Sequence, residues 1–136
     1  MSLVTGQIIH NRYRVVKVIG QGGFGSIYRV WDVELNRPLA LKENFDTTSS
    51  AQDHFLREAS LLASLRHPNL PVVIDYFVIL GQGQYLTMDY IEGEDLQEKM
   101  DRSPGSLPES QVVNWLMQIC DALEYLHSQN PPIIHR

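Results

Sequence analysis

Residues 19–30 read IGQGGFGSIYRV, and four of the six positions from Gly20 to Gly25 are glycine. Glycine is costly in a strand, because it loses the most backbone freedom on ordering and has no side chain to pack. Nevertheless, runs rich in branched and aromatic residues flank the glycines, YRVVKVI before them and SIYRVW after them. The segment therefore predicts two strands joined by a turn of bare backbone.

The spacing of Gly20, Gly22 and Gly25 fits the pattern G-x-G-x-x-G, which has two common meanings. In dinucleotide-binding folds a helix follows the last glycine directly, but here a β-branched and aromatic run follows it. Between two strands, bare amides can instead lie over a phosphate chain, because no Cβ keeps the backbone away. A flexible hairpin that binds no ligand is the alternative, and the loop alone leaves it open.

A lysine and a carboxylate in the next two elements are expected to need each other. In the strand LALK, the period of two places Ala40 and Lys42 on one face. In the following helix, at about 100° per residue, Glu58 falls inside an apolar arc of Phe55, Leu61, Leu62 and Leu65. A buried carboxylate is costly unless a cation meets it, so we expect Lys42 to pair with Glu58 and to reach nucleotide phosphates. The alternatives are a Lys42 solvated at a strand edge and a Glu58 at the margin of the arc that turns to water.

The chain beyond the third strand alternates between helix and strand patterns. A helix is expected from about Ser50 until His67-Pro68, because proline disfavours a helical residue before it. Two apolar runs joined by GQG predict a second hairpin over residues 70–91. The segment DLQEKMDR predicts a short helix at residues 95–102.

The strongest helical pattern covers residues 110–128. Ser106 and Glu109 fit a capping box at its start, with Pro108 near the first turn. Apolar residues recur at spacings of three and four along one stripe of Val112, Leu116, Ile119, Leu123 and Leu126. Left uncovered, this stripe exceeds what a monomer usually exposes, so we expect self-association through this helix.

The composition narrows the functional class. The 136 residues allow one domain or part of a larger one, and the 43% hydrophobic content argues against disorder. The 11 basic and 16 acidic residues give a net charge of -5 without a basic patch, which argues against nucleic acid as a partner. Cys120 is the sole cysteine, which excludes an internal disulfide and suits a reducing cytosol. The histidines lack metal-ligand spacing, so no metal site is expected, and no apolar run approaches the roughly 20 residues of a membrane span.

Together these segments resemble the protein kinase family, specifically its bacterial members that are similar to eukaryotic Ser/Thr kinases, from about Tyr13 to Arg136. IGQGGFGSI resembles the Gly-rich loop G-x-G-x-x-G-x-V with Ile27 in place of valine, and LALK resembles the V-A-I-K strand. YLTMDYIEGEDL is similar to the hinge, and ALEYLH followed by PPIIHR is similar to the helix that leads into the catalytic loop H-R-D-L-x-x-x-N. Four motifs in the family's order are far more specific than any one of them.

The resemblance implies an α+β fold. It would be a kinase N-lobe, with a five-stranded antiparallel sheet plus helix C, followed by the hinge and the first helices of the C-lobe. Residues 1–12 would be an N-terminal extension, residues 13–91 the N-lobe, and residues 92–136 the end of the hinge with the truncated start of the C-lobe.

The resemblance also implies roles for individual residues. Lys42 would hold the α- and β-phosphates of ATP, and Glu58 would position Lys42. Met88 would be the gatekeeper beside the base. The backbone of Asp89 and of Ile91 would hydrogen-bond to adenine, and Asp95 would lie near the ribose. The apolar walls around the base would come from Ile19, Ile27 and Ala40. The loop over the phosphates would consist of Gly20, Gln21, Gly22, Gly23, Phe24, Gly25 and Ser26.

The sequence departs from the family at its end. It stops at Arg136, one residue before the catalytic aspartate, and the catalytic-loop Asn, the D-F-G metal ligand, the activation segment and A-P-E do not occur in it. ATP with Mg²⁺ is therefore expected for the full-length enzyme, and the 136-residue polypeptide by itself is expected to be inactive. His135 and Arg136 are expected to shape the loop rather than to do chemistry.

We therefore interpret the sequence as the ATP-binding portion of a serine/threonine protein kinase, which transfers the γ-phosphoryl of ATP to a protein hydroxyl. Its protein substrate is not indicated, and the preference for Ser/Thr rests on overall similarity. A cytoplasmic location is expected, although the full-length protein could carry a membrane anchor outside this chain. One alternative is a non-catalytic nucleotide-binding or interaction module, similar to a pseudokinase. Another is that the stop at Arg136 does not reflect the natural gene.

Overall fold

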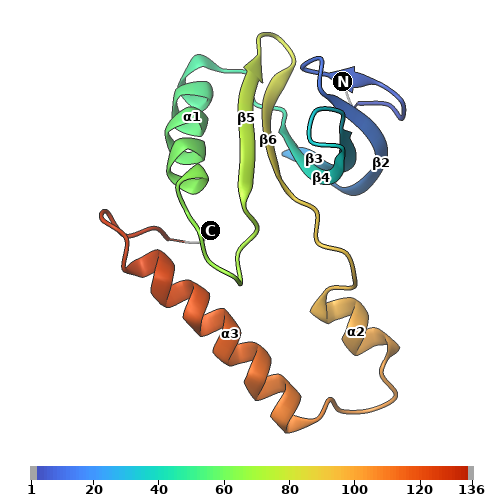
Figure 1. Cartoon of the computed structure of the whole chain (residues 1–136), viewed down its shortest axis with the longest axis vertical. Helices are drawn as coiled ribbons and strands as arrows, with labels where there is room; N and C mark the ends of the chain where they lie inside the picture. Colours follow the sequence, from blue (N-terminus) through green and yellow to red (C-terminus); the bar gives the residue numbers. More distant parts are fainter. Residues whose placement is uncertain (1–2, 135–136) are drawn as a thin grey trace. The chain divides into compact units, whose positions relative to one another are not determined.

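Six antiparallel strands form one curled sheet in the order β1-β2-β3-β4-β6-β5 (Figure 1). The computed structural model describes residues 3–134, so His135, Arg136 and the first two residues of the expected N-terminal extension lie outside the described residues. All five strands expected from the sequence are present, and the two-residue β1 adds a sixth. The strands are β1 (Ile8–Ile9), β2 (Tyr13–Gly22), β3 (Gly25–Asp32), β4 (Arg37–Asn44), β5 (Val73–Ile79) and β6 (Gly83–Asp89).

The apolar core lies on one face of this sheet, and a hydrogen bond joins strands from its two ends. The Tyr13 hydroxyl on β2 donates to Asp75 Oδ2 on β5 at 2.7 Å. The rings of Tyr13 and Phe77 also stack, with their centroids 5.9 Å apart. Because β2 and β5 stand far apart in the strand order, these contacts require the sheet to curl over its core into a half-barrel.

A buried ion pair fixes the N-terminal end of β2 to the end of β3. Arg12 donates from Nε and a terminal nitrogen to the two carboxylate oxygens of Asp32, at 2.9 and 2.8 Å. Burial alone would raise the pKa of Asp32, but the bonds from Arg12 and from the N–H groups of Leu35 and Glu34 outweigh it and lower that pKa below its ordinary value. The Asp32 carboxylate is therefore buried with its charge satisfied, while the Arg12 side chain stays 20% exposed.

Helix α1 (Ser49–Ala63) runs beside β5 and buries Ala59 (Figure 1). It begins where the sequence predicts, because the Thr48 side chain caps it by accepting from the Ala51 N–H at 3.3 Å. It ends at Ala63, earlier than the expected stop at His67-Pro68. The Ser64 hydroxyl donates to the Leu61 carbonyl at 2.7 Å and closes the last turn.

The chain divides into two compact units, and the sheet with α1 belongs to the first, which comprises residues up to Arg66 and Pro71–Ile91. The second unit comprises His67–Leu70 and the residues from Glu92 onward. It contains α2 (Leu96–Arg102) and α3 (Glu109–His127).

The helix caps of the second unit differ from the sequence-based expectation. Pro108 occupies the N-cap position of α3 and makes no side-chain cap bond, so the capping box expected from Ser106 and Glu109 is wrong. The Pro108 carbonyl starts the helix and thereby leaves Ser106 outside the cap. A capping box is present instead at α2, where Asp95 and Glu98 each accept the backbone N–H of the other, at 2.8 and 2.9 Å.

Because three tyrosines are buried, we expect the folded state to lose stability at alkaline pH. Burial, with the neighbouring carboxylates second, raises the pKa values of Tyr13, Tyr28 and Tyr85 above the ordinary value of 10.0. In the unfolded chain they ionise near that value, so their contribution to stability is complete below pH 10.0 and is lost as the pH rises above it. We expect the free energy of unfolding to fall above that pH by up to about 1.4 kcal/mol per pH unit for each tyrosine.

Urea unfolding followed by circular dichroism between about pH 8 and pH 11.5 checks this slope. Tyr13→Phe is the control, because it removes one of the three ionisations and should make the slope shallower. An unfolding free energy that stays flat across this range would contradict the assignment.

Candidate functional site

The glycine stretch forms a strand–turn–strand hairpin, as predicted. Strands β2 and β3 pair as far as Gly22 opposite Gly25, which leaves Gly23 and Phe24 as the turn. Phe24 is 92% exposed at the tip. The Phe45 N–H, just after β4, donates to the Phe24 carbonyl at 3.2 Å and ties the tip to the end of β4. No helix follows the last glycine, so the dinucleotide-binding pattern is excluded.

The glycines of the hairpin differ in what surrounds them. A Cβ at Gly25 would lie 1.9 Å from the backbone oxygen of Glu43, so β3 and β4 approach too closely there for any side chain. A Cβ at Gly22 or Gly23 would meet nothing within 4 Å. Packing inside the protein therefore requires glycine at Gly25, whereas at Gly22 and Gly23 the backbone faces open space, which suits a ligand.

The strand register places the expected wall residues on the same face as Lys42. Lys42 lies opposite Ile27 on β3, and Ala40 lies opposite Met88 on β6. Cross-strand partners share a face, and residues two apart on a strand do so as well. Ile19 stands where the β2–β3 register shifts, between Val18 and Gly20.

Ser26 departs from this arrangement. It lies opposite Glu43, and its side chain is buried with the core face rather than with the Lys42 face. Its Oγ has no hydrogen-bond partner among the described residues. Any contact of Ser26 with a ligand over the hairpin would therefore come from its backbone.

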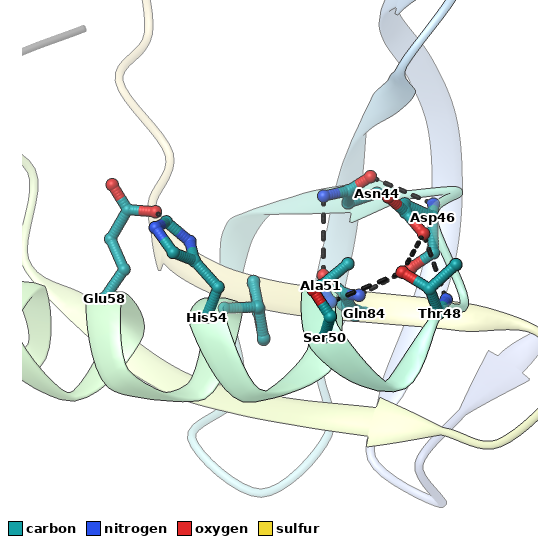
Figure 2. A pocket seen from close by; sticks show the side chains of 9 residues that line it. Asn44, Asp46, Thr48, Ser50, Ala51, His54, Glu58 and Gln84 are labelled. Carbon is teal, nitrogen blue, oxygen red and sulfur yellow. Dashed lines mark hydrogen bonds and ion pairs between the residues drawn. The ribbon is translucent and has the colours of Figure 1, made fainter.

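Glu58 does not lie where the helical arc placed it. Its side chain is 56% exposed, and its carboxylate lies 3.7 Å from Nδ1 of His54, one turn earlier on α1. Figure 2 shows the His54 and Glu58 side chains beside each other on one side of the helix. Helix α1 buries Ala59 against the sheet, and this rotation turns the neighbouring Glu58 toward water. The structure thus agrees with the alternative in which Glu58 lies at the margin of the apolar arc.

Lys42 is exposed on β4, and among the ion pairs of residues 3–134 none joins it to Glu58. The structure therefore brings Lys42 together with the wall residues but not with its expected carboxylate. Their pairing stays a prediction.

A polar pocket of about 300 Å³ lies between the end of β4 and the first turns of α1 (Figure 2). Buried Gln84 shapes its floor, because it donates to the Asp46 carbonyl and accepts from Asn44 Nδ2 at 3.4 Å. This amide pair was not predicted from the sequence, although Asn44 follows Lys42 by two residues on the same strand face. The lining residues are Asn44, Asp46, Thr48, Ser50, Ala51, His54, Phe55, Glu58 and Gln84.

The segment after β6 is anchored by several polar contacts. The Asp89 N–H donates to the Val72 carbonyl at 3.0 Å, and the Asp89 carboxylate accepts from the Val72 N–H at 2.9 Å. Arg37 lies 3.7 Å from the same carboxylate. The Arg29 guanidinium lies 5.1 Å from the centre of the Tyr90 ring. The expected adenine contact of Asp89 therefore sits on a braced strand end, whereas Ile91 lies in the irregular segment after it and is largely exposed.

Two further expectations concern Asp95 and metals. Asp95 belongs to the second unit, where its carboxylate caps α2. Within residues 3–134, no group of three or more His, Cys, Asp or Glu residues is placed to hold a metal ion. In the same part of the chain, no helix has both the length and the apolar character needed to cross a membrane.

Comparisons with known proteins agree with this geometry. The family model described as "Protein kinase domain" matches residues 13–136. The probable serine/threonine-protein kinase YbdM of Bacillus subtilis is 31% identical over 130 residues, which cover 93% of this chain and 50% of YbdM. The serine/threonine-protein kinase PrkC of the same organism is 33% identical over 140 residues, covering 98% of this chain and 20% of PrkC.

Solved structures give the same relationship. The crystal structure of the Mycobacterium tuberculosis PknI kinase domain matches with a TM-score of 0.75 at 28% identity. The match covers 93% of this chain and 52% of that kinase domain. The chain thus spans about half the length of YbdM and of the PknI kinase domain.

Proposed function

Because this chain belongs to the protein kinase family, we propose that it is the ATP-binding portion of a serine/threonine protein kinase. The complete enzyme transfers the γ-phosphoryl of ATP to a protein hydroxyl. The observation that carries the proposal is the bare-backbone hairpin, which joins two strands of the sheet whose face opposite the core holds Lys42, Ala40 and Met88. Sequence similarity to bacterial serine/threonine kinases supports the same reading.

The hairpin and Lys42 act on the phosphates in this proposal. The backbone amides at Gly22 and Gly23 cover the phosphate chain, because no atom of the protein occupies the space that a Cβ would take there. Lys42 provides a positioned charge for the α- and β-phosphates. The adenine packs between the apolar side chains of Ile27, Ala40 and Met88.

In this proposal the end of β6 and the residues that follow it recognise the edge of the adenine base. The Asp89 N–H is already donated to Val72, so the contribution of Asp89 to the base comes from its carbonyl oxygen. The backbone of Ile91, the last residue of the first unit, supplies the second contact. Asp95 is proposed to lie near the ribose in the complete site.

Glu58 is proposed to leave His54 and pair with Lys42 when ATP binds. The present His54–Glu58 contact is a long one between two largely exposed side chains on adjacent helical turns. Such surface pairs contribute little to stability, so the folded state loses little free energy when Glu58 changes its partner from His54 to Lys42. The ATP phosphates then fix the lysine that Glu58 meets.

The magnesium ion that accompanies ATP finds no cluster of carboxylate or imidazole ligands within residues 3–134. Mg²⁺ bound to ATP would neutralise charge on its β- and γ-oxygens. The given sequence also contains no D-F-G motif, which supplies a metal ligand in the family. We therefore infer that the 136-residue polypeptide by itself does not transfer phosphate at a useful rate. Separately, we propose a cytoplasmic location, which the single cysteine, Cys120, suits.

Calorimetric titration of ATP into the chain tests the proposed function. We expect saturable binding to one site, and an absence of binding heat at millimolar ATP would overturn it. Radiolabelled ATP with a generic protein substrate tests the inferred inactivity. Turnover that Lys42→Ala abolishes would refute that inference.

The exposed apolar side chains of helix α3 lead us to expect self-association of the chain. Val113, Leu116, Met117 and Ile119 are all exposed on it, whereas Leu126 is buried. Burying these side chains between two copies removes apolar area from water. We expect light scattering to report a mass that rises with concentration, and Leu116→Glu to return it to the monomer mass. Asn114→Glu adds the same charge on the other side of the helix and is the control. A monomer at high concentration would rule out this contact.

A further inference from the structure

Glu43 is a buried carboxylate directly beside Lys42 on β4. It is 1% exposed and lies on the core face, while Lys42 lies on the opposite face. Its Oε2 accepts from the Tyr28 hydroxyl on β3 at 2.7 Å, and its Oε1 accepts from the Tyr85 hydroxyl on β6 at 3.0 Å. The carboxylate thus joins the three central strands of the sheet.

Stability alone does not account for a carboxylate at this position. A charge in the core is costly even when it is well bonded, and an apolar side chain of similar volume usually serves the packing as well or better. Burial, followed by the interactions with Glu43, raises the pKa values of Tyr28 and Tyr85, so both hydroxyls stay protonated and continue to donate. What two directed bonds add to packing is a defined position for the strand.

The same residue touches the glycine hairpin through its backbone. The Glu43 carbonyl oxygen is the atom that Gly25 approaches too closely for a Cβ. Glu43 therefore lies between the two parts proposed to act on ATP, since Lys42 precedes it on β4 and its carbonyl oxygen lies against Gly25, the first residue of β3. A displacement of Glu43 moves both.

An N-terminal strap, residues 3–9, is connected to this carboxylate. The Leu3 N–H donates to the Tyr28 hydroxyl oxygen at 3.1 Å, and Leu3 and Ile9 are buried in the core. Further along the strap, Gly6 and Gln7 bond to the backbone of Val15, both at 2.8 Å. The segment expected to be an extension outside the lobe is therefore part of its core, and a chain of hydrogen bonds runs from Leu3 through Tyr28 to Glu43.

We propose that Glu43, held by Tyr28 and Tyr85, is a positioning residue that fixes β4 beneath the glycine hairpin so that Lys42 reaches the phosphates of ATP, and that the N-terminal strap supports it through Tyr28. This inference rests on the proposed ATP-binding function. It makes the core face of the sheet a determinant of phosphate recognition on the opposite face. The adenine contacts, which come from other residues, do not depend on it.

The test compares ATP with adenosine, which lacks the phosphates that Lys42 contacts. Tyr28→Phe and Tyr85→Phe each remove one donor to Glu43 and keep the ring. We expect each to weaken ATP binding about fivefold to tenfold, the equivalent of one lost hydrogen bond, and to leave adenosine binding unchanged. Leu3→Pro, which removes the N–H that Tyr28 accepts, should act in the same direction with a smaller effect.

Tyr13→Phe is the matched control. It removes the hydroxyl of an equally buried tyrosine, which donates to the carboxylate of Asp75 rather than to Glu43. It should lower the urea midpoint as Tyr28→Phe does and leave both affinities unchanged. Equal weakening of ATP and adenosine by the Tyr28 and Tyr85 variants, no weakening, or the same selective loss in Tyr13→Phe would overturn the inference. A wild-type chain that binds neither ligand would overturn the proposed function itself.

Discussion

Gly25→Ala is expected to lower the free energy of unfolding by about 3 kcal/mol or more. The alanine Cβ would lie 1.9 Å from the carbonyl oxygen of Glu43. Neither atom can move away without its strand, because the Cβ is attached directly to the β3 backbone and the oxygen is part of the β4 backbone. The strands must separate to accommodate it, which breaks the ladder between β3 and β4 at the base of the hairpin. Urea unfolding followed by circular dichroism measures the loss.

Gly23→Ala is the control for this prediction. Its added methyl would meet nothing within 4 Å, so we expect a change in unfolding free energy within about 1 kcal/mol. The two variants add the same group to the same hairpin, two residues apart. Equal stability of Gly25→Ala and Gly23→Ala would show that β3 and β4 do not approach as closely as described.

Lys42→Ala is expected to weaken ATP binding by at least about tenfold while leaving adenosine binding unchanged. The reason is that a charge placed close to the phosphates gains more than the roughly 1.4 kcal/mol that a factor of ten requires. Parallel calorimetric titrations with the two ligands separate the phosphate contribution from that of the base. Lys42 is exposed, so the variant should unfold at the same urea concentration as the wild type.

The control for Lys42→Ala is Lys17→Ala, which removes the same charge from another exposed position of the sheet. If both substitutions weaken ATP equally, the effect comes from net charge rather than from a positioned ammonium. Such a result would contradict the role proposed for Lys42.

Local pattern was sufficient for much of the fold. The change from β-branched residues to glycine and back predicted the hairpin at Gly22–Gly25, because period-two alternation and bare turns are properties of short segments. The shared face of Ala40 and Lys42 follows from the same alternation, whereas the register that aligns Lys42 with Ile27, and Ala40 with Met88, is known only from the paired strands.

Features that depend on tertiary packing were not predictable in this way. The helical arc around Glu58 was a correct reading of angular spacing, but spacing does not say which side of a helix meets the sheet, and α1 buries Ala59. Likewise, alternation places Glu43 on the side of Leu39 and Leu41, but only the assembled strands bring tyrosine hydroxyls to it. The two-residue β1 is too short to carry a periodic signal.

A double-mutant cycle on ATP affinity tests the central claim most directly, namely that Lys42 and Glu58 act together on the phosphates beneath the glycine hairpin. Calorimetry would compare wild type, Lys42→Ala, Glu58→Ala and the double variant. We predict that the double variant binds ATP no more weakly than Lys42→Ala, because Glu58 acts only through the lysine. Losses that simply add, or a Glu58→Ala variant that binds ATP as the wild type does, would contradict the account.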